Sequence, residues 1–333
     1  MARTADLCRR ARGQLRYLVT GAAGFIGSRL ATRLSREGHI VVGLDDLSAG
    51  SRSNLAEAPD VDLWLGDVRD AQLVNELTAG CDVVFHLAAV RSIVRSMDEP
   101  GLAEQVNTRG TLNVLLAAQA HSARVVFASS SSVYGHQDHF PLREDAAPRP
   151  HSPYAASKLA SEIYCQTWWR AFSVRTVSLR FFNVYGPGMD PYGRYALVVP
   201  IFIQALLDGR RPVIHGDGEQ ARDFTHVDDV VHAMLRAASS SEEAWGGVYN
   251  IGGGRTPTSI RMLLQIIASH VGVPVDPTFE PPRPGDMLRT EADVSLARDM
   301  LGYEPTIDLD EGIRGTVDWF RTRQVALGTT LGM

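Results

Sequence analysis

The sequence is nearly without lysine, poor in cysteine and free of long apolar runs. Lys158 is the single lysine among 33 basic residues, so every other basic position is arginine. The three cysteines, Cys8, Cys81 and Cys165, are odd in number and lack the spacing of a metal site, so we expect reduced structural thiols and no metal. No apolar run approaches a membrane span, and residues 1–15 lack the hydrophobic region of a signal peptide. We therefore expect a cytoplasmic protein without a membrane partner.

An excess of basic charge is also lacking. The formal net charge is -5, and the arginines are scattered among acids without basic blocks, so the charge pattern gives no case for a nucleic-acid partner. With 333 residues, of which 44% are hydrophobic, the chain can bury a full core. The composition therefore predicts one compact unit of two lobes.

What the sequence does have is a tyrosine, Tyr154, four residues before its single lysine. Lysine is a compact point charge, whereas arginine is a wide planar fork, so the lysine indicates a site that needs the smaller cation. A small cation beside a phenol favours the phenolate and makes tyrosine a usable base. The pair predicts catalytic roles for Tyr154 and Lys158; the alternative is a surface pair one helical turn apart.

A glycine-rich turn near the N-terminus predicts a nucleotide cofactor. Residues 16–20 have the pattern of a short buried strand, and an amphipathic run follows the glycines at 21, 24 and 27. Such glycines let the backbone approach a pyrophosphate at a helix N-terminus, where unpaired N–H groups and the helix dipole attract anions.

The acid after the next strand indicates which cofactor. The apolar run 40–44 ends in Asp45, close to where a dinucleotide fold places an acid on the adenosine ribose. Asp45 and Asp46 would repel the 2′-phosphate of NADP, so the sequence predicts NAD. Arg52 offers the alternative of a ligand for that phosphate, and a solvated loop arginine is the simpler interpretation.

Strand-like runs alternate with helical stretches, which indicates an α/β fold with a doubly wound parallel sheet. Its strands are expected at residues 16–20, 41–45, 61–66, 83–88, 124–129 and 174–181. After Tyr185 the pattern is mixed and predicts a smaller substrate lobe, with helices near 197–207, 227–238, 259–269 and 312–321 and a strand at 212–215.

Short motifs follow one another in order along nearly the whole chain. They are Thr20–Gly27, Leu44–Ser48, Gly66-Asp67-Val68, His86-Leu87-Ala88-Ala89, Ala128–Gly135, the pair Tyr154 and Lys158, Leu179–Pro187, and Arg222-Asp223-Phe224. In this order they resemble the extended short-chain dehydrogenase/reductase family and, within it, the nucleotide-sugar 4-epimerases. The resemblance implies a tail at 1–15, a mainly NAD-binding Rossmann domain at 16–184, a mainly UDP-sugar-binding lobe at 185–325 with the chain crossing between lobes, and a tail at 326–333.

The resemblance also implies which residues hold NAD. They are Gly21, Gly24, Phe25, Ile26, Gly27, Asp45, Asp46, Leu47, Ser48, Asp67, Val68, Leu87, Ala88, Ala89, Asn107, Tyr154, Lys158 and Phe181.

The chemistry implied by the resemblance needs three catalytic residues. Tyr154, helped by Lys158, would take the proton of a sugar hydroxyl while the attached carbon gives hydride to NAD, and Ser130 would hydrogen-bond the same oxygen. The alternative for Ser130 is a turn serine in a serine-rich loop. Related dehydratases and decarboxylases carry acids just after this serine, whereas Ser131 and Ser132 have no usable pKa near neutrality. The expected reaction is therefore 4-epimerisation.

The same resemblance assigns the nucleotide part of the substrate. Arg222 and Arg283 fall on arginines that clamp the diphosphate, and Asn183 would donate to the phosphates. Asp286 would hold the uridine ribose.

Other positions would border the base and the sugar. His215, with Val213, would border uracil, although a packing role for His215 is equally plausible. Thr290 falls where small residues leave space at C2 for an N-acetyl group. The expected substrate residues are Arg91, Ser130, Ser131, Tyr154, Phe182, Asn183, Arg194, Val198, Val213, His215, Arg222, Arg283, Asp286 and Thr290.

Arg194 is the sharpest departure from epimerases of neutral sugars. An arginine facing a neutral C6 hydroxyl would be desolvated without an anion, whereas one facing a C6 carboxylate would be paired. This favours UDP-glucuronate and UDP-galacturonate, and the sequence, with its actinomycete-like arginine bias, resembles UDP-glucuronate 4-epimerases of antibiotic pathways. An Arg194 turned to solvent is the alternative, with UDP-glucose or UDP-N-acetylglucosamine as substrate.

Two helices predict the assembly. Residues 111–120 and 155–172 correspond to those that form a four-helix dimer interface in the family, with Trp168 and Trp169 at that surface or beneath it, so we expect a homodimer.

Two alternatives to a 4-epimerase remain: an enzyme of another reaction, such as a dehydratase or reductase, and a non-enzymatic NAD-sensing module. The intact Ser130, Tyr154 and Lys158 argue against the second.

Overall fold

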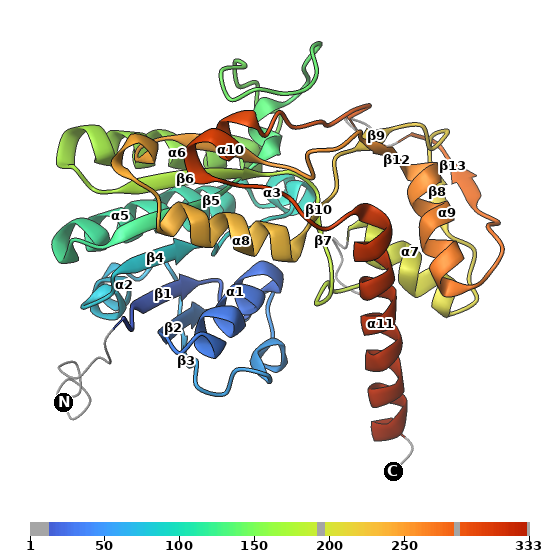
Figure 1. The fold of residues 1–333 in the computed structure, drawn as a ribbon, viewed down its shortest axis with the longest axis horizontal. Coiled ribbons are helices and arrows are strands. Elements are labelled where there is room, and N and C mark those ends of the chain that lie inside the picture. The colour runs from blue at the N-terminus through green and yellow to red at the C-terminus, as the bar shows by residue number, and fades with distance from the viewer. Residues whose placement is uncertain (1–12, 192–196, 283–286, 332–333) are drawn as a thin grey trace.

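The computed structural model describes residues 13–191, 197–282 and 287–331. Its centre is a seven-stranded sheet in the order β11-β6-β5-β4-β1-β2-β3 (Figure 1), and every neighbouring pair is parallel. The strands are β1 (Arg16–Thr20), β2 (Ile40–Asp45), β3 (Asp62–Leu65), β4 (Val83–His86), β5 (Arg124–Ser130), β6 (Thr176–Phe181) and β11 (Val248–Ile251). The predicted Rossmann-type sheet is confirmed, and its order reverses between β1 and β4, where such folds bind ligands.

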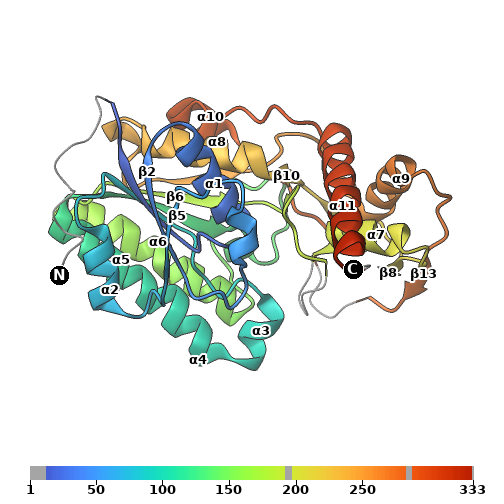
Figure 2. The same ribbon diagram turned by 90° about the horizontal axis from the view of Figure 1, so that it is seen from below.

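Helices cover both faces of the sheet, as Figure 2 shows from below. One face carries α2 (Ala71–Thr78), α5 (Gly110–His121) and α6 (Pro153–Phe172); the other carries α1 (Phe25–Arg36) and α8 (Val227–Ala238). Successive strand side chains alternate between these faces. Leu18 accordingly packs in the core beneath α2 and α5, while its neighbour Val19 packs beneath α1 and α8.

The smaller lobe has a core of its own. It contains α7 (Val198–Leu207), β8 (Val213–His215), α9 (Ile260–Val271), β13 (Thr278–Glu280) and α11 (Leu309–Leu331). Phe202, Leu263 and Phe320, from three of its helices, pack together there. Two short ladders are formed by β7 (Val184–Tyr185) with β10 (Thr225–His226) and by β9 (Ala221–Arg222) with β12 (Thr258–Ser259).

Short elements complete the described chain. They are η2 (Arg52–Leu55), α3 (Ile93–Asp98), α4 (Pro100–Ala103), the π-helical η3 (Glu104–Arg109), η4 (Ser131–Tyr134), η5 (Glu242–Ala244) and α10 (Ser295–Leu301).

Two expectations about the lobes need correction. The helix at 227–238 was expected in the substrate lobe, but α8 packs on the sheet against α1 and β5, because its apolar face, which includes Val230 and Met234, completes that core. The sequence prediction also lacked β11, which pairs with β6 and returns the chain to the Rossmann lobe.

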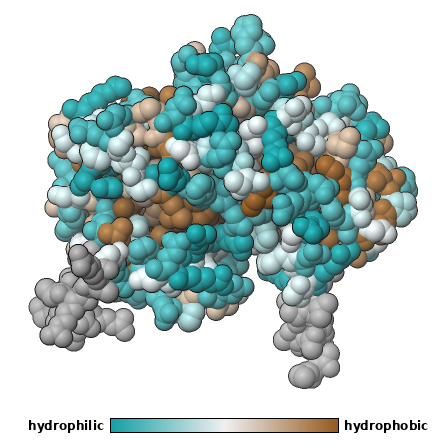
Figure 3. Space-filling view, viewed as in Figure 1, coloured by the Kyte–Doolittle hydropathy of each residue, from teal (hydrophilic) through white to brown (hydrophobic). Residues whose placement is uncertain are grey.

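The surface is mixed. Figure 3 shows a mostly hydrophilic face with separate apolar patches on each lobe. Within the described part of the chain, no helix is both long and apolar enough to cross a membrane.

Candidate active site

The glycine turn after β1 has the close packing that a cofactor cradle needs. Gly21 has a φ of +72°, and a Cβ there would lie 2.9 Å from the Ala88 backbone nitrogen. A Cβ on Gly27 would collide with the Gly21 carbonyl oxygen. Helix α1 begins after Gly24 without any side-chain cap. The cradle therefore stays open and presents helix N–H groups, which fits a pyrophosphate.

Asp45 lies at this turn, at the end of β2. Its Oδ2 accepts from the Ala23 backbone N–H at 2.9 Å and its Oδ1 from that of Leu47 at 2.8 Å. Burial raises the pKa of its carboxyl, and these two bonds oppose the rise. Asp45 therefore holds the turn in shape, and each oxygen keeps acceptor capacity for a ribose hydroxyl.

Two other predicted cofactor residues have partners within the chain. Asp46 Oδ1 accepts from the Ser48 backbone N–H at 2.9 Å. Asp67 pairs with Arg69 at 2.6 Å, which holds the pKa of its carboxyl below the usual value. Arg52, the alternative phosphate ligand, is exposed in η2.

Asn107 is buried in the π-helical turn η3 and fastens the loop after β4 to helix α6, which carries Tyr154. Its side chain accepts from the Val90 N–H at 2.8 Å and donates to the Val90 carbonyl at 3.2 Å and the Ser157 hydroxyl at 2.9 Å. Ser157 in turn donates to the Tyr154 carbonyl at 2.8 Å. A π-turn often marks a functional position, and this one connects the predicted cofactor loop to Tyr154.

The three predicted catalytic residues come together at the end of β5. Ser152 caps α6 by accepting from the Ala155 N–H at 3.1 Å, so Tyr154 and Lys158 lie on successive turns of one face. Lys158 Nζ donates to the Ala128 carbonyl at 2.7 Å and lies 4.8 Å from the centre of the Phe127 ring. Both Tyr154 and Lys158 are buried, which excludes the surface-pair alternative.

Burial shifts the titration of both groups. It raises the pKa of the Tyr154 phenol, and the hydrogen bond with Ser130 and the charge of Arg91 oppose that rise. It also lowers the pKa of Lys158 to about 8, against the charge of Glu162. The charge of Arg91 acts on the phenol, while the Lys158 ammonium donates to the Ala128 carbonyl, so the help that Lys158 would give to Tyr154 stays a prediction.

The residues after Ser130 carry no carboxyl group. Ser130 caps η4 by accepting from the Ser132 N–H at 3.1 Å. It therefore has the role of a turn serine, which was the alternative, and it also contacts Tyr154. Ser131 is half-buried at the start of η4. Neither Ser131 nor Ser132 has a carboxyl, the group with which an elimination moves protons.

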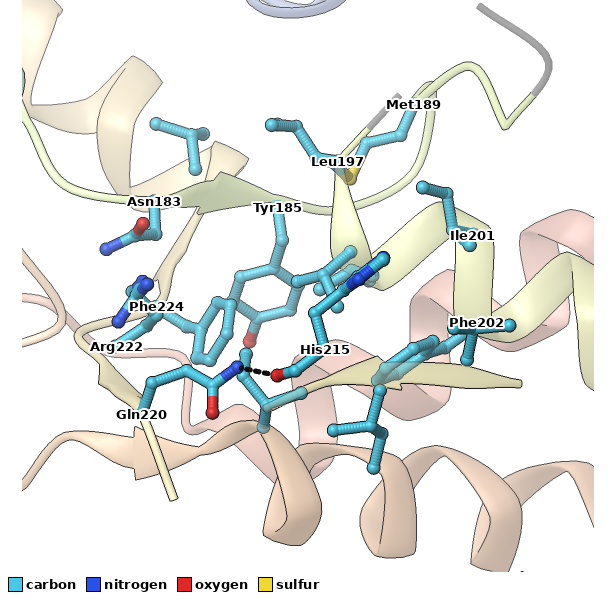
Figure 4. A pocket seen from close by; sticks show the side chains of 16 residues that line it. Asn183, Tyr185, Met189, Leu197, Ile201, Phe202, His215, Gln220, Arg222 and Phe224 are labelled. Atoms are coloured by element: carbon cyan, nitrogen blue, oxygen red, sulfur yellow. Dashed lines mark hydrogen bonds between the residues drawn. The ribbon is translucent and has the colours of Figure 1, made fainter. Parts of the chain in front are cut away.

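A cavity of about 290 Å³ lies against the core of the smaller lobe, lined by Tyr185, Phe202, Phe224 and at least thirteen further residues; Ser130, Tyr154 and Lys158 are not among them. Five predicted substrate residues line it, namely Asn183, Val198, Val213, His215 and Arg222. Figure 4 shows Asn183 and Arg222 at one end and Ile201 and Phe202 at the other. The polar end suits an anion, and the aromatic middle suits a planar base.

Sequence reasoning missed several of the lining residues. Tyr185, Phe202 and Phe224 have the spacing of core residues, so their sequence signal is that of packing. Gln220 had no signal of its own; it donates to the His215 carbonyl at 2.8 Å and fixes the strand that borders the cavity, as the dashed line in Figure 4 shows.

A buried polar cluster lies behind the cavity. Asn183 donates to the Asp223 carbonyl and to the Thr290 hydroxyl, both at 2.9 Å. Asp223 accepts from the N–H groups of Gly253, at 2.7 Å, and Ala292, at 2.9 Å. Burial raises the pKa of the Asp223 carboxyl to about 6, against these two bonds. The cluster thus fixes three separate segments beside Arg222.

The remaining predicted residues are placed as follows. Phe182 is fully buried and packs near Tyr134, so its contact with substrate stays a prediction. Phe181 ends β6, and Arg91 lies exposed in the loop after β4. Arg194, Arg283 and Asp286 lie outside the described residues.

The fold and the site define a dinucleotide-dependent enzyme, and the comparison with known families agrees. Residues 17–252 match the NAD dependent epimerase/dehydratase family. The chain belongs to this family, whose cofactor is NAD, and the cradle formed by Gly21 and Gly27 fits that cofactor.

Individual relatives are similar over nearly their full length. The chain is 44% identical over 315 residues to the UDP-glucose 4-epimerase of Mycolicibacterium smegmatis, covering 93% of this chain and 99% of that protein. The solved UDP-N-acetylglucosamine 4-epimerase from Methanobrevibacter ruminantium M1 has a TM-score of 0.89 and 36% identity, covering 93% and 99% of the two chains. MoeE5, solved with UDP-glucuronic acid and NAD, has a TM-score of 0.83 and 35% identity, covering 92% and 99%.

Proposed function

We propose that the chain catalyses the NAD-dependent 4-epimerisation of a UDP-hexose. The observation that carries this proposal is the meeting of Ser130, Tyr154 and Lys158 at the end of β5, followed by serines where an elimination would need an acid and a base.

The residues divide the chemistry between them. Bound NAD supplies the acceptor and later the donor of one hydride. Tyr154 takes the proton of the 4-hydroxyl, and Ser130 holds the same oxygen, while the C4–H bond breaks and a 4-keto sugar forms. With the cofactor bound, reduction of the ketone on its opposite face, together with return of the proton from Tyr154 to the oxygen, would give the C4 epimer without net oxidation.

The cavity supports a uridine diphosphate as the handle of the substrate. Arg222 lies at its polar end with a planar guanidinium suited to paired phosphate oxygens. Val213 and His215 also line the cavity, and a base would lie against them and the aromatic side chains. We expect Arg283, Asp286 and Asn183 to complete the contacts with the diphosphate and the ribose.

Among UDP-hexoses we favour UDP-glucuronate, converted to UDP-galacturonate. The support is Arg194, whose guanidinium would pair with a C6 carboxylate, and the likeness to MoeE5. The relatives from M. smegmatis and M. ruminantium support UDP-glucose and UDP-N-acetylglucosamine equally well, so the preference for UDP-glucuronate rests on Arg194. A role in an actinomycete antibiotic pathway stays a prediction.

We further propose a cytoplasmic homodimer. Cys81 and Cys165 are buried as thiols, as a reducing compartment allows. Leu116 on α5 and Ile163 on α6 expose half of their side-chain surface or more, at 50% and 55%, on the two helices predicted to pair. Trp168 packs into the core beneath this surface, and Trp169 contacts Trp245 instead.

The direct test is a substrate panel. Purified protein is incubated with UDP-glucuronate, UDP-glucose and UDP-N-acetylglucosamine, and the C4 epimers are resolved by chromatography. Epimer formation from UDP-glucuronate at the highest kcat/KM is expected. Release of a dehydrated product, or consumption of cofactor in stoichiometric amounts, would replace epimerisation by a dehydratase or reductase activity.

A further inference from the structure

Three consecutive residues at the end of β5, Ala128 to Ser130, each contact a residue of α6. Two of these contacts are with Tyr154 and Lys158, which the proposed chemistry uses, and the third is with Glu162. Ser130 meets Tyr154, and the Ala128 carbonyl accepts from Lys158 Nζ at 2.7 Å. Between them, the Ser129 hydroxyl donates to Glu162 Oε1. Tyr154, Lys158 and Glu162 occupy successive turns of α6, so each turn holds one residue of the strand.

Glu162 is buried and ionically paired. Arg180, on the neighbouring strand β6, donates from Nε to Oε1 at 3.0 Å and from Nη2 to Oε2 at 2.7 Å. The side chains of Glu162 and Arg180 are only 1% and 4% exposed. Because burying two charges costs desolvation that their attraction often fails to recover, such a pair is weak evidence for a role in stability.

The register of the sheet explains why Arg180 is the partner. Arg180 pairs with Ser129 across β5 and β6, so the carboxylate of Glu162 reaches both strands from above. Arg180 also lies 4.6 Å from the centre of the Tyr134 ring and donates to the Glu144 carbonyl at 3.4 Å. The guanidinium is therefore held on several sides, and Glu162 is oriented by it.

Glu162 is also the acid that faces Lys158. The other titratable groups that interact with this lysine are held neutral by burial: it raises the pKa of the Cys165 thiol to about 12 and lowers that of the His86 imidazole, on β4, to about 3. The Tyr154 phenol is raised as well. Among the described residues, Glu162 thus supplies the negative charge that supports the Lys158 ammonium.

We propose that Glu162 is a positioning residue of this active site, which holds Ser129, and with it Ala128 and Ser130, in register with Tyr154 and Lys158, and keeps Lys158 in its cationic form. Arg180 orients Glu162 and compensates its charge. The kinetic part of this inference rests on the proposed epimerisation, whereas the part about the charge on Lys158 does not.

Two variants separate geometry from charge. Ser129→Ala removes the bond to the strand and leaves the ion pair intact. Glu162→Gln combined with Arg180→Met removes both charges at similar volume and leaves an amide oxygen that still accepts from Ser129. Thr78→Val is the matched control, because it removes a buried hydroxyl bonded to the Val74 carbonyl on the distant helix α2.

The kinetic experiment measures kcat, KM and the pH profile of kcat for the holoenzymes with their best UDP-sugar. For Ser129→Ala we expect kcat to fall roughly tenfold to a hundredfold with little change in KM and bound NAD, because a small misplacement of a catalytic group is costly. Thr78→Val should match the wild type. Wild-type kcat in a folded Ser129→Ala protein that carries NAD would overturn the positioning role.

The protonation of Lys158 can be measured directly, because Lys158 is the single lysine of the chain. Lysine labelled with ¹³C at Cε gives one side-chain resonance, and its pH titration reports Lys158 alone. We expect a midpoint near pH 8 in the wild type and in Ser129→Ala, and a lower midpoint in the Glu162→Gln/Arg180→Met protein.

The outcomes are distinguishable. An unchanged lysine midpoint in the double variant would overturn the electrostatic role. If the wild type epimerises no sugar, the proposed function fails while the lysine titration still decides the charge on Lys158. Because Ser129→Ala keeps both charges, it remains a test even where the double variant does not fold.

Discussion

At the residue scale, Tyr154 is the group on which the proposed chemistry depends most directly. Tyr154→Phe removes the oxygen that takes the proton and keeps the buried ring, so we expect the fold and NAD content to persist. We expect kcat to fall by about 10²- to 10⁴-fold, the usual contribution of a general base. Steady-state kinetics with the best UDP-sugar measure it, and near-normal turnover would contradict the mechanism.

Lys158 occupies a site shaped for lysine. Its side chain is 3% exposed, with Nζ bound to the Ala128 carbonyl and facing the Phe127 ring. A guanidinium is wider and planar, so Lys158→Arg should conserve charge and still lose most activity, whether or not NAD stays bound. Measuring kcat and NAD content separates these effects, and activity equal to wild type would refute the interpretation of the single lysine.

Arg194 decides the proposed preference for a uronate. A bidentate pair with the C6 carboxylate would contribute about 1.5 to 3 kcal/mol to binding and fix the carboxylate plane. Arg194→Ala should therefore lower kcat/KM for UDP-glucuronate much more than for UDP-glucose. It should also release some 4-keto-pentose, because a freed β-keto acid loses carbon dioxide. Equal losses on both substrates would return UDP-glucose or UDP-N-acetylglucosamine to first place.

At the scale of elements, the sequence predicted the central strands of the sheet well and its two edge strands, β3 and β11, poorly. Residues 83–85 and 125–128, for example, are continuous apolar segments, as is typical of strands covered on both faces. The edge strand β3 is shorter than expected, because Leu65 and Trp64 are exposed and only β2 pairs with it. β11 was missed because its short run after two glycines has no local signal and depends on pairing with β6.

The site divides in a similar way. Motifs whose chemistry is local, such as Gly21, Tyr154 and Lys158, were predictable from spacing. The roles of Glu162 and Arg180 were not predictable, because their pairing depends on the packing of α6 over β5 and β6. In the sequence, a single acid on a helix has the pattern of an ordinary surface residue.

Asp223 holds the segments of Gly253 and Ala292 to its own, so its titration affects the stability of the fold. Burial raises its folded pKa to about 6, above its ordinary value of 3.8, so the folded state binds more protons than the unfolded chain between these values. This contribution to stability is greatest at the acid end of that window and is lost as the pH rises towards 6.

Asp223→Asn should remove this pH dependence. The amide has one acceptor oxygen for the N–H groups of Gly253 and Ala292, so we expect a loss of about 1 to 3 kcal/mol at pH 7 and a larger deficit at pH 5. Urea unfolding at both values measures it, with the exposed Asp62→Asn as control. KM for the UDP-sugar should also rise, because Asn183 and Arg222 lie beside this cluster. A deficit that does not grow towards pH 5 would contradict the assigned titration.

At the scale of the whole molecule, the apolar surface of α5 and α6 predicts the assembly. Leu116, Ile163 and Phe172 are 50%, 55% and 50% exposed on these neighbouring helices. Exposed apolar residues that gather on adjacent helices favour an interface, whereas scattered ones need no explanation. A second copy of the same surface would bury them by four-helix packing about a twofold axis.

Sedimentation velocity over a range of concentrations measures the prediction. We expect a dimer for the wild type and a monomer for Ile163→Glu, because a carboxylate at the centre of the interface would be buried without a partner. Met262→Glu is the matched control, since Met262 is also 50% exposed but lies on α9 of the smaller lobe, and it should remain dimeric. A wild type that sediments as a monomer at every concentration would refute the interface. If both variants stay dimeric, the dimer forms through a surface other than α5 and α6.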